Sequence, residues 1–169
     1  MADRGDYMRD AQWRRGFALL SRYDLSFDVQ IYDHQAPDAA ILARAFPETT
    51  LIIEHLGWPI AIDSAVGFEH WAERLMMLAE SPNVFLKVSG VGCVFRRANP
   101  DLIRQYLRRA VAIFGLQRCL FGSNCPPDTL FYDFRKLLGI YTDAFSDLTP
   151  EAQGAIFFDN ARRVYRLPE

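Results

Sequence analysis

The chain has 169 residues, a formal net charge of −2 and a hydrophobic content of 50%. This composition is typical of a globular protein with a buried core and excludes a disordered chain. The charge is small and no basic block stands out, which argues against a nucleic-acid partner. The three cysteines lack C-x-x-C spacing, no apolar run could span a bilayer, and the polar start is unlike a signal peptide. We therefore expect a cytoplasmic protein with neither a nucleic-acid nor a membrane partner.

Helical and strand-like patterns alternate along the sequence. In chain order they predict a helix at 10–22, a strand at 25–31, a helix at 37–46, a strand at 50–54, a helix at 68–80, a strand at 83–89, a helix at 100–114, a strand at 118–121 and two helices at 131–145 and 150–164. Short strands separated by helices indicate parallel β-α units. No linker or low-complexity segment divides these units, so we predict an α/β fold in a single domain, residues 1–169.

Polar side chains follow the predicted strands. His34 comes after the first strand, His55 after the second, and Ser123 and Asn124 after the fourth, while Lys87 interrupts the apolar third strand. In α/β folds, ligands bind at the carboxyl ends of the strands, whether the sheet is open or closed into a barrel. The sequence therefore predicts part of an active site at this edge of the sheet.

Five segments resemble, in order, the strand ends and final helix of the amidohydrolase 2 family: FDVQIYDHQ, LIIEHLGWP, NVFLKVSGVG, RCLFGSNCPPD and FFDNARRVYRL. This family contains TIM-barrel hydrolases, among them sugar lactonases and dicarboxylate lactonases, and related decarboxylases. The resemblance covers residues 13–167 and implies a (β/α)8 TIM-barrel type of fold. A full barrel has eight strands and typically ~250 residues, so this chain is expected to supply about four units, strands five to eight. The family's His-x-His pair of strand one is not in this sequence, which predicts a missing N-terminal half or a half-barrel that must pair.

Asn124 is the main departure from the family pattern. Much of the family has G-S-D-W-P after strand eight, and its Asp binds metal, activates water, or both, whereas this sequence has GSNCP at 122–126. An amide cannot take up a proton and is a poorer metal ligand than a carboxylate. The sequence resembles a variant of the family that reads G-S-N-x-P. Asp128 could supply a carboxylate if the turn at 126–127 folds it back.

The resemblance also implies roles for other residues. His55 corresponds to the strand-six histidine, which binds metal or donates a hydrogen bond to the substrate carbonyl; the alternative is a loop histidine. Lys87 or Arg96 would steady an anionic group of the substrate, with a structural ion pair as the alternative for Lys87. Trp58 would form an apolar wall over a substrate ring. The full set of expected site residues is His55, Asn124, Lys87 and His34 for catalysis, and Trp58, Arg96, Ser123, Asp128 and Gln30 for substrate binding.

The expected reaction is hydrolysis of a small lactone or related cyclic ester by water attack on the carbonyl. A divalent metal, Zn or Mn, would need at least three ligands around an activated water, of which this chain offers at most His55 and one more. A metal-free hydrolase is therefore the other option. Two alternative functions remain: nonoxidative decarboxylation on the same scaffold, and a catalytically inactive half-barrel whose open sheet edges favour self-association.

Overall fold

The computed structural model describes residues 4–96 and 98–168 and is built around one parallel four-stranded sheet. The strands pair in sequence order, so each β-α unit adds a strand beside the previous one. The predicted α/β class is confirmed, and each predicted strand contains an observed one. The strands are β1 (Phe27–Val29), β2 (Leu51–Ile53), β3 (Val84–Val88) and β4 (Cys119–Phe121).

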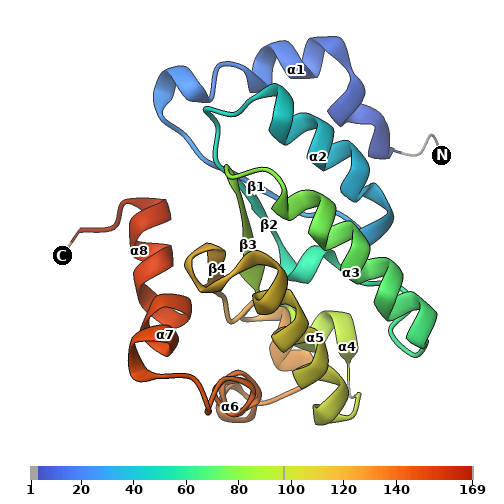
Figure 1. Cartoon of the computed structure of the whole chain (residues 1–169), viewed down its shortest axis with the longest axis vertical. Coiled ribbons are helices and arrows are strands. Elements are labelled where there is room, and N and C mark those ends of the chain that lie inside the picture. The colour runs from blue at the N-terminus through green and yellow to red at the C-terminus, as the bar shows by residue number, and fades with distance from the viewer. Residues whose placement is uncertain (1–3, 97, 169) are drawn as a thin grey trace.

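Helices connect the strands and lie on both sides of the sheet (Figure 1). Within the described residues, no helix is long and apolar enough to cross a membrane. The helices are α1 (Ala11–Phe17), α2 (Ala36–Ala45), α3 (Ala65–Ala79), α4 (Val91–Phe95), α5 (Pro100–Phe114), α6 (Phe134–Ala144), α7 (Pro150–Gly154) and α8 (Asn160–Tyr165), with a π-helical turn at Ala155–Asp159 between the last two. Short 3-10 turns are η1 (Arg4–Arg9), η2 (Ser21–Tyr23), η3 (Asp33–Gln35), η4 (His55–Gly57), η5 (Leu116–Arg118) and η6 (Pro127–Leu130).

The first predicted helix is shorter than expected, the last contains a π-helical turn, and one observed helix was not predicted. The helix expected at 10–22 ends at Phe17, and Asp24 then turns the chain toward β1 with a φ of 52°. Helix α4 was not expected, because its five residues are too few to show a helical period and begin after Gly90, which has a φ of 73°. The turn formed by α4 matters for the site, because it places two backbone N–H groups beside the loop after β4.

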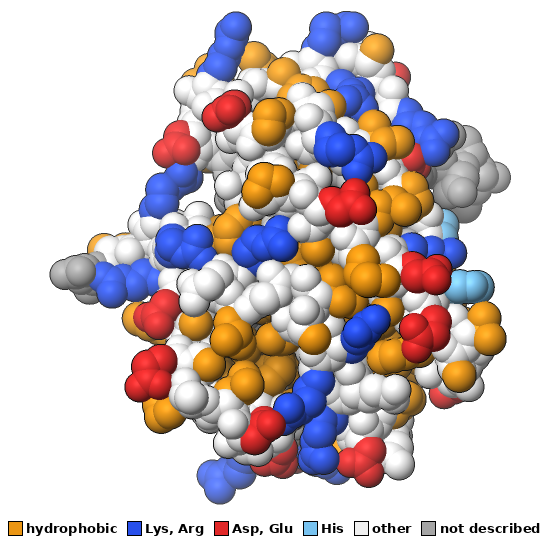
Figure 2. Space-filling model, in the orientation of Figure 1, with side chains coloured by type: hydrophobic (Ala, Val, Ile, Leu, Met, Phe, Trp, Pro, Cys, Tyr) orange, Lys and Arg blue, Asp and Glu red, His pale blue; other side chains and the backbone are white. Residues whose placement is uncertain are grey.

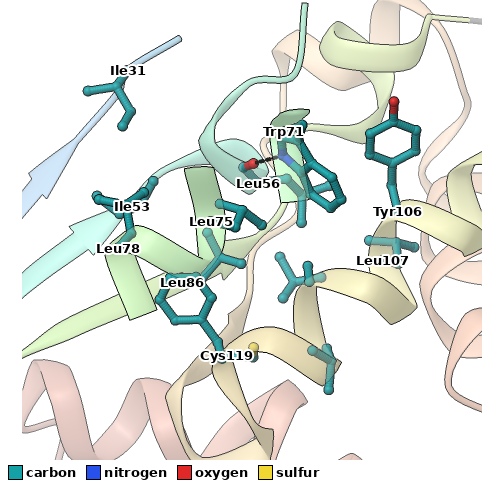
Figure 3. Packing of buried hydrophobic residues seen from close by; sticks show 14 of the residues in the cluster. Ile31, Ile53, Leu56, Trp71, Leu75, Leu78, Leu86, Tyr106, Leu107 and Cys119 are labelled. Carbon is teal, nitrogen blue, oxygen red and sulfur yellow. Dashed lines mark hydrogen bonds between the residues drawn. The ribbon is translucent and has the colours of Figure 1, made fainter. Parts of the chain in front are cut away.

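The main core lies between the sheet and helices α2, α3 and α5. Alternate strand residues such as Ile53 and Leu86 point toward these helices and are fully buried against Leu75 and Trp71 of α3 (Figure 3). The indole Nε1 of Trp71 donates a 2.8 Å hydrogen bond to the backbone oxygen of Leu56. Helix α3 is therefore attached both to the sheet and to the loop that follows β2.

The opposite face of the sheet carries charged and aromatic side chains. Lys87 of β3 donates to Asp28 of β1 at 2.6 Å and to Glu54 after β2 at 2.7 Å. Tyr165 of α8 donates to the same Asp28 carboxylate at 2.7 Å, and Arg163 lies 5.5 Å from the centre of the Phe85 ring. Helix α8 thus reaches this second face, and in Figure 1 it lies across the strands from α2 and α3. On the molecular face in Figure 2, acidic and basic side chains are interspersed around apolar ones.

Candidate active site

The loops after β2, β3 and β4 meet at the carboxyl edge of the sheet. His55 follows β2, Ser89 and Gly90 follow β3, and Gly122 follows β4. A Cβ atom on Gly90 would lie only 2.6 Å from Cγ of His55, and one on Gly122 would lie 3.2 Å from Cβ of Ser89. Gly90 also has a φ of 73°, which side chains disfavour. The imidazole of His55 therefore lies directly against the backbone of the neighbouring loop.

Both ring nitrogens of the buried His55 have polar neighbours. Its Nδ1 lies 2.9 Å from Oγ of Ser89, and its Nε2 lies 3.3 Å from a carboxylate oxygen of Glu54. A carboxylate can only accept hydrogen bonds, so the proton of a neutral ring belongs on Nε2, and Nδ1 accepts the Ser89 hydroxyl. Burial lowers the pKa of His55 below 6.5, and the charges of Glu54 and Asp128 offset only part of this effect. His55 is therefore held as a neutral imidazole in one tautomer at neutral pH.

The backbone that carries His55 has an uncommon conformation. Four consecutive residues have positive φ: His55 at 53°, Leu56 at 59°, Gly57 at 64° and Trp58 at 41°. Each residue other than glycine in this left-handed region costs about 1–3 kcal/mol, and such strain concentrates at functional sites. The hydrogen bond from Trp71 to Leu56, and another from the Asp33 N–H to the Trp58 oxygen, hold the turn in place. The fold thus maintains a strained segment that directs the imidazole inward.

Lys87 is engaged by carboxylates on both sides. Burial alone would lower its pKa, but hydrogen bonds to Asp28 and Glu54 outweigh burial and raise the pKa above its ordinary value. The sequence left two interpretations open, an anion-binding lysine and a structural ion pair, and the structure contains the ion pair. Glu54 joins this pair to His55, since one of its oxygens contacts Lys87 and the other lies near the imidazole.

The loop after β4 folds back as the sequence analysis required for Asp128 to reach the site region. The Asp128 carboxylate is fully buried and accepts hydrogen bonds from the N–H groups of Gly92 and Cys93, both at 2.9 Å. It also accepts a 2.8 Å hydrogen bond from Nδ2 of Asn124, which has a φ of 50°. Asp128 was expected to bind substrate directly, but its oxygens are occupied by these donors. Its effect on a substrate would therefore pass through Asn124.

Aromatic rings connect His34 to His55. His34 is exposed and stacks on Tyr32 with 5.9 Å between ring centres and 9° between ring planes. Trp58 lies edge-on to Tyr32 at 6.0 Å and to His55 at 5.7 Å. Trp58 thus lies beside His55, while His34 lies at the outer end of the row. Tyr32 was not among the expected site residues.

The remaining candidates occupy the rim or have local roles. Arg96 ends α4 in an exposed position, and Gln30 is exposed just after β1. The Ser123 hydroxyl accepts a 3.3 Å hydrogen bond from the N–H of Cys125. Burial and a hydrogen bond to Asp128 raise the pKa of Cys93 to about 11, so this thiol stays protonated at neutral pH.

Sequence reasoning missed two partners of His55. Ser89 and Glu54 each lie beside a strand end that was identified, but neither was given a role. The contact of Ser89 with His55 depends on the parallel register that pairs β2 with β3, whereas Glu54 directly precedes His55 in the chain. The position of both residues at strand ends was the signal that could have singled them out.

Comparison with known proteins identifies the family of this chain. The family described as Amidohydrolase, amidohydrolase 2, matches residues 2–167. The chain belongs to the amidohydrolase 2 family. The resemblance seen in the strand-end motifs is therefore confirmed.

Relatives of this amidohydrolase 2 chain are longer than the chain itself. An uncharacterized protein, y4mH, from Sinorhizobium fredii is 35% identical over 159 residues, which are 94% of this chain and 53% of that protein. An L-fucono-1,5-lactonase from Burkholderia multivorans is 29% identical over 178 residues, covering 99% of this chain and 60% of the relative. A crystal structure of an amidohydrolase from Burkholderia multivorans with bound Zn superposes with a TM-score of 0.91 at 28% identity, over 99% of this chain and 62% of that one. The chain thus spans a little over half the length of these relatives.

The side chains of this segment do not by themselves fit a metal site. Within residues 4–96 and 98–168, no three His, Cys, Asp or Glu side chains converge closely enough to hold a metal ion. Zinc sites use three or four such ligands, and a ligating histidine must leave one nitrogen lone pair free. In His55, Nδ1 faces Ser89 and Nε2 faces Glu54. A metal in the complete protein would therefore need ligands from outside this chain.

Proposed function

We propose that the complete protein hydrolyses a small lactone or related cyclic ester, and that this chain supplies strands five to eight of its (β/α)8 barrel. Membership of the amidohydrolase 2 family and the lactonase name of the Burkholderia relatives support the reaction class. The observation that carries the proposal is the buried His55, held between Ser89 and Glu54 at the carboxyl edge of the sheet. Ligands of α/β folds bind at that edge.

The proposed reaction joins a water oxygen to the lactone carbonyl carbon and breaks the ring carbon–oxygen bond. The water proton goes to the departing ring oxygen, which gives an open-chain hydroxy acid. The Nε2 proton of His55 is the donor best placed for the carbonyl oxygen, because its 3.3 Å contact with Glu54 is longer than a charge-assisted hydrogen bond of about 2.7–2.9 Å. Such a donor stabilises the negative charge that develops on that oxygen in the transition state.

Neighbouring residues complete this arrangement. Ser89 fixes the tautomer of His55 by donating to Nδ1, and Trp58 packs edge-on to the imidazole at 5.7 Å, where its ring would wall one side of the substrate. Arg96 and Gln30 are the exposed polar groups at the rim that a substrate carboxylate or hydroxyl would meet. Lys87 acts indirectly, because its hydrogen bond to Glu54 holds that carboxylate beside His55.

The test is lactone hydrolysis by the protein at its full natural length, with the 169-residue chain assayed in parallel. A panel of sugar lactones and pyrone carboxylates is followed by acid release in weak buffer. His55→Ala should lower kcat/KM by about 10²–10³-fold, the usual effect of losing one oxyanion donor. His70→Ala, on the exposed face of α3, is the matched control and should retain full activity. Near-wild-type turnover of His55→Ala would refute the assignment.

The same preparations separate the alternatives. Release of carbon dioxide from aromatic or unsaturated acids, without lactone hydrolysis, would establish the decarboxylase instead. Adding Zn or Mn to chelator-treated protein tests whether the complete site uses a metal. Light scattering of the isolated chain measures its oligomeric state. Self-association is expected if the open sheet edges need a second half-barrel, and a stable monomer would contradict this.

A further inference from the structure

The loop after β4 contains a polar arrangement that the proposed reaction does not by itself explain. Asp128 is fully buried, yet its carboxylate has three donors: the N–H of Gly92, the N–H of Cys93 and Nδ2 of Asn124. The backbone of α4 approaches so closely that a Cβ on Gly92 would lie 2.8 Å from Cβ of Asp128. A buried carboxylate held this way is fixed in position, because each lost donor would weaken the compensation of its buried charge.

This fixed carboxylate determines how the amide of Asn124 is oriented. A carboxylate only accepts hydrogen bonds, so the group of Asn124 that lies 2.8 Å from it must be the amide nitrogen and not the amide oxygen. The same nitrogen lies 3.7 Å from Sγ of Cys93. Both contacts use Nδ2, and the amide oxygen points to neither partner. Asn124 is half-buried, so this oxygen is available to a ligand.

We infer that Asp128 is a positioning residue that orients the Asn124 amide, so that the loop after β4 offers a neutral hydrogen-bond acceptor to a water molecule or a substrate hydroxyl. This inference deepens the proposed function and rests on it for the identity of the substrate. The carboxylate of this loop lies four residues further along the chain than Asn124, and its oxygens are taken up by the N–H groups of α4 and by the Asn124 amide. The loop therefore presents an oriented amide oxygen in place of a carboxylate that could take up a proton. An amide oxygen accepts hydrogen bonds from donors such as a water molecule or a hydroxyl group.

The decisive variant is Asn124→Asp, which places a carboxylate at this position. In this chain it would place a second carboxylate oxygen about 2.8 Å from the buried carboxylate of Asp128. Two carboxylates so close cannot both ionise freely, and together they retain a proton to higher pH than in the unfolded chain. We expect the folded-to-unfolded ratio in urea at neutral pH to fall at least about tenfold, and the loss to shrink as the pH falls toward about 4.

The titratable groups around Asp128 are few. Cys93 of α4 and Tyr141 of α6 have pKa values raised mainly by burial, and the pKa of His55 is lowered mainly by burial. All three are present in both proteins, so the difference between variant and wild type isolates the new carboxylate. Asn99→Asp is the matched control, because it makes the same substitution at the exposed N-cap of α5, where a carboxylate caps as well as an amide. Its stability should stay close to wild type across the same pH range.

Two further measurements keep the inference testable if Asn124→Asp does not fold at neutral pH. In wild-type protein, NMR should show the Asn124 side-chain amide protons shifted downfield and exchanging slowly, and Asp128→Asn should remove both properties. The double variant Asn124→Asp with Asp128→Asn restores one donor between the two positions and should regain part of the stability lost by Asn124→Asp. Equal stability of Asn124→Asp and wild type at neutral pH, or a loss that does not change with pH, would overturn the inference. These readouts need no substrate, so they stand whether or not lactone hydrolysis is found.

Discussion

Replacing Gly90 with alanine tests whether His55 owes its position to the neighbouring loop. The added Cβ would meet Cγ, Nδ1 and Cβ of His55 at 2.6, 2.7 and 2.8 Å, and Gly90 has a φ of 73°. An L-residue in that region costs roughly 1–2 kcal/mol, and forcing atoms into a packed site costs roughly 1–3 kcal/mol more. We therefore expect Gly90→Ala to lower the free energy of unfolding by about 2–5 kcal/mol.

Gly115 provides a control that separates the two contributions. Its φ is 77°, but a Cβ built there meets nothing within 4 Å. Gly115→Ala should lose stability through its backbone alone, because its φ of 77° and ψ of 158° lie in a region essentially limited to glycine, and it should leave His55 untouched. Urea denaturation of both variants gives the difference, and the imidazole NMR signals of His55 should shift in Gly90→Ala alone. Unchanged His55 signals in Gly90→Ala would refute this account of how the histidine is positioned.

Three more predictions concern the turn, the imidazole and a helix surface. Trp71→Phe keeps an aromatic ring but leaves the Leu56 oxygen without its donor, so urea denaturation should show a loss of about 1–3 kcal/mol. The pKa of His55 is lowered in the folded protein, so its contribution to stability is complete above pH 6.5 and is lost as the pH falls through its folded-state pKa. His55→Gln should therefore flatten this part of a curve of unfolding free energy against pH. An unchanged curve would contradict the burial argument. A Cβ added at Gly139 in α6 would meet no atom within 4 Å, so Gly139→Ala should raise the free energy of unfolding by roughly 0.5–1 kcal/mol. Destabilisation would show that this position is more crowded than the structure indicates.

The sequence predicts elements well where one pattern dominates. Helix α5 matches its predicted bounds, because its apolar residues recur at helical spacing, Asn99 caps it, Pro100 begins it and Gly115 follows it. Strand bounds were too long by one to four residues, since the apolar patterns continue past the last residue that pairs with a neighbouring strand. Parallel β-α units followed from the alternation of strands and helices.

The arrangement of side chains at the site was less accessible to sequence reasoning. The left-handed turn at 55–58 contains one glycine among four residues, so composition does not signal it. The partners of His55 and Lys87 come from neighbouring strands, and a pattern along one chain does not give cross-strand register. Asp128 was singled out near Asn124, and the two are hydrogen-bonded, but the burial of Asp128 depends on the backbone of α4, a helix the sequence did not reveal.

The hydrogen bond from Tyr165 to Asp28 has a consequence for how the chain folds. It joins residues 137 positions apart, and thus the last helix to the first strand. Closing so long a loop in an unfolded chain costs roughly 4 kcal/mol of entropy, more than one hydrogen bond returns. This contact is therefore expected to form late, after β1 to β4 have assembled and brought the two ends together. Removing α8 should consequently speed unfolding while leaving the folding rate almost unchanged, because interactions absent from the transition state act mainly on the unfolding rate.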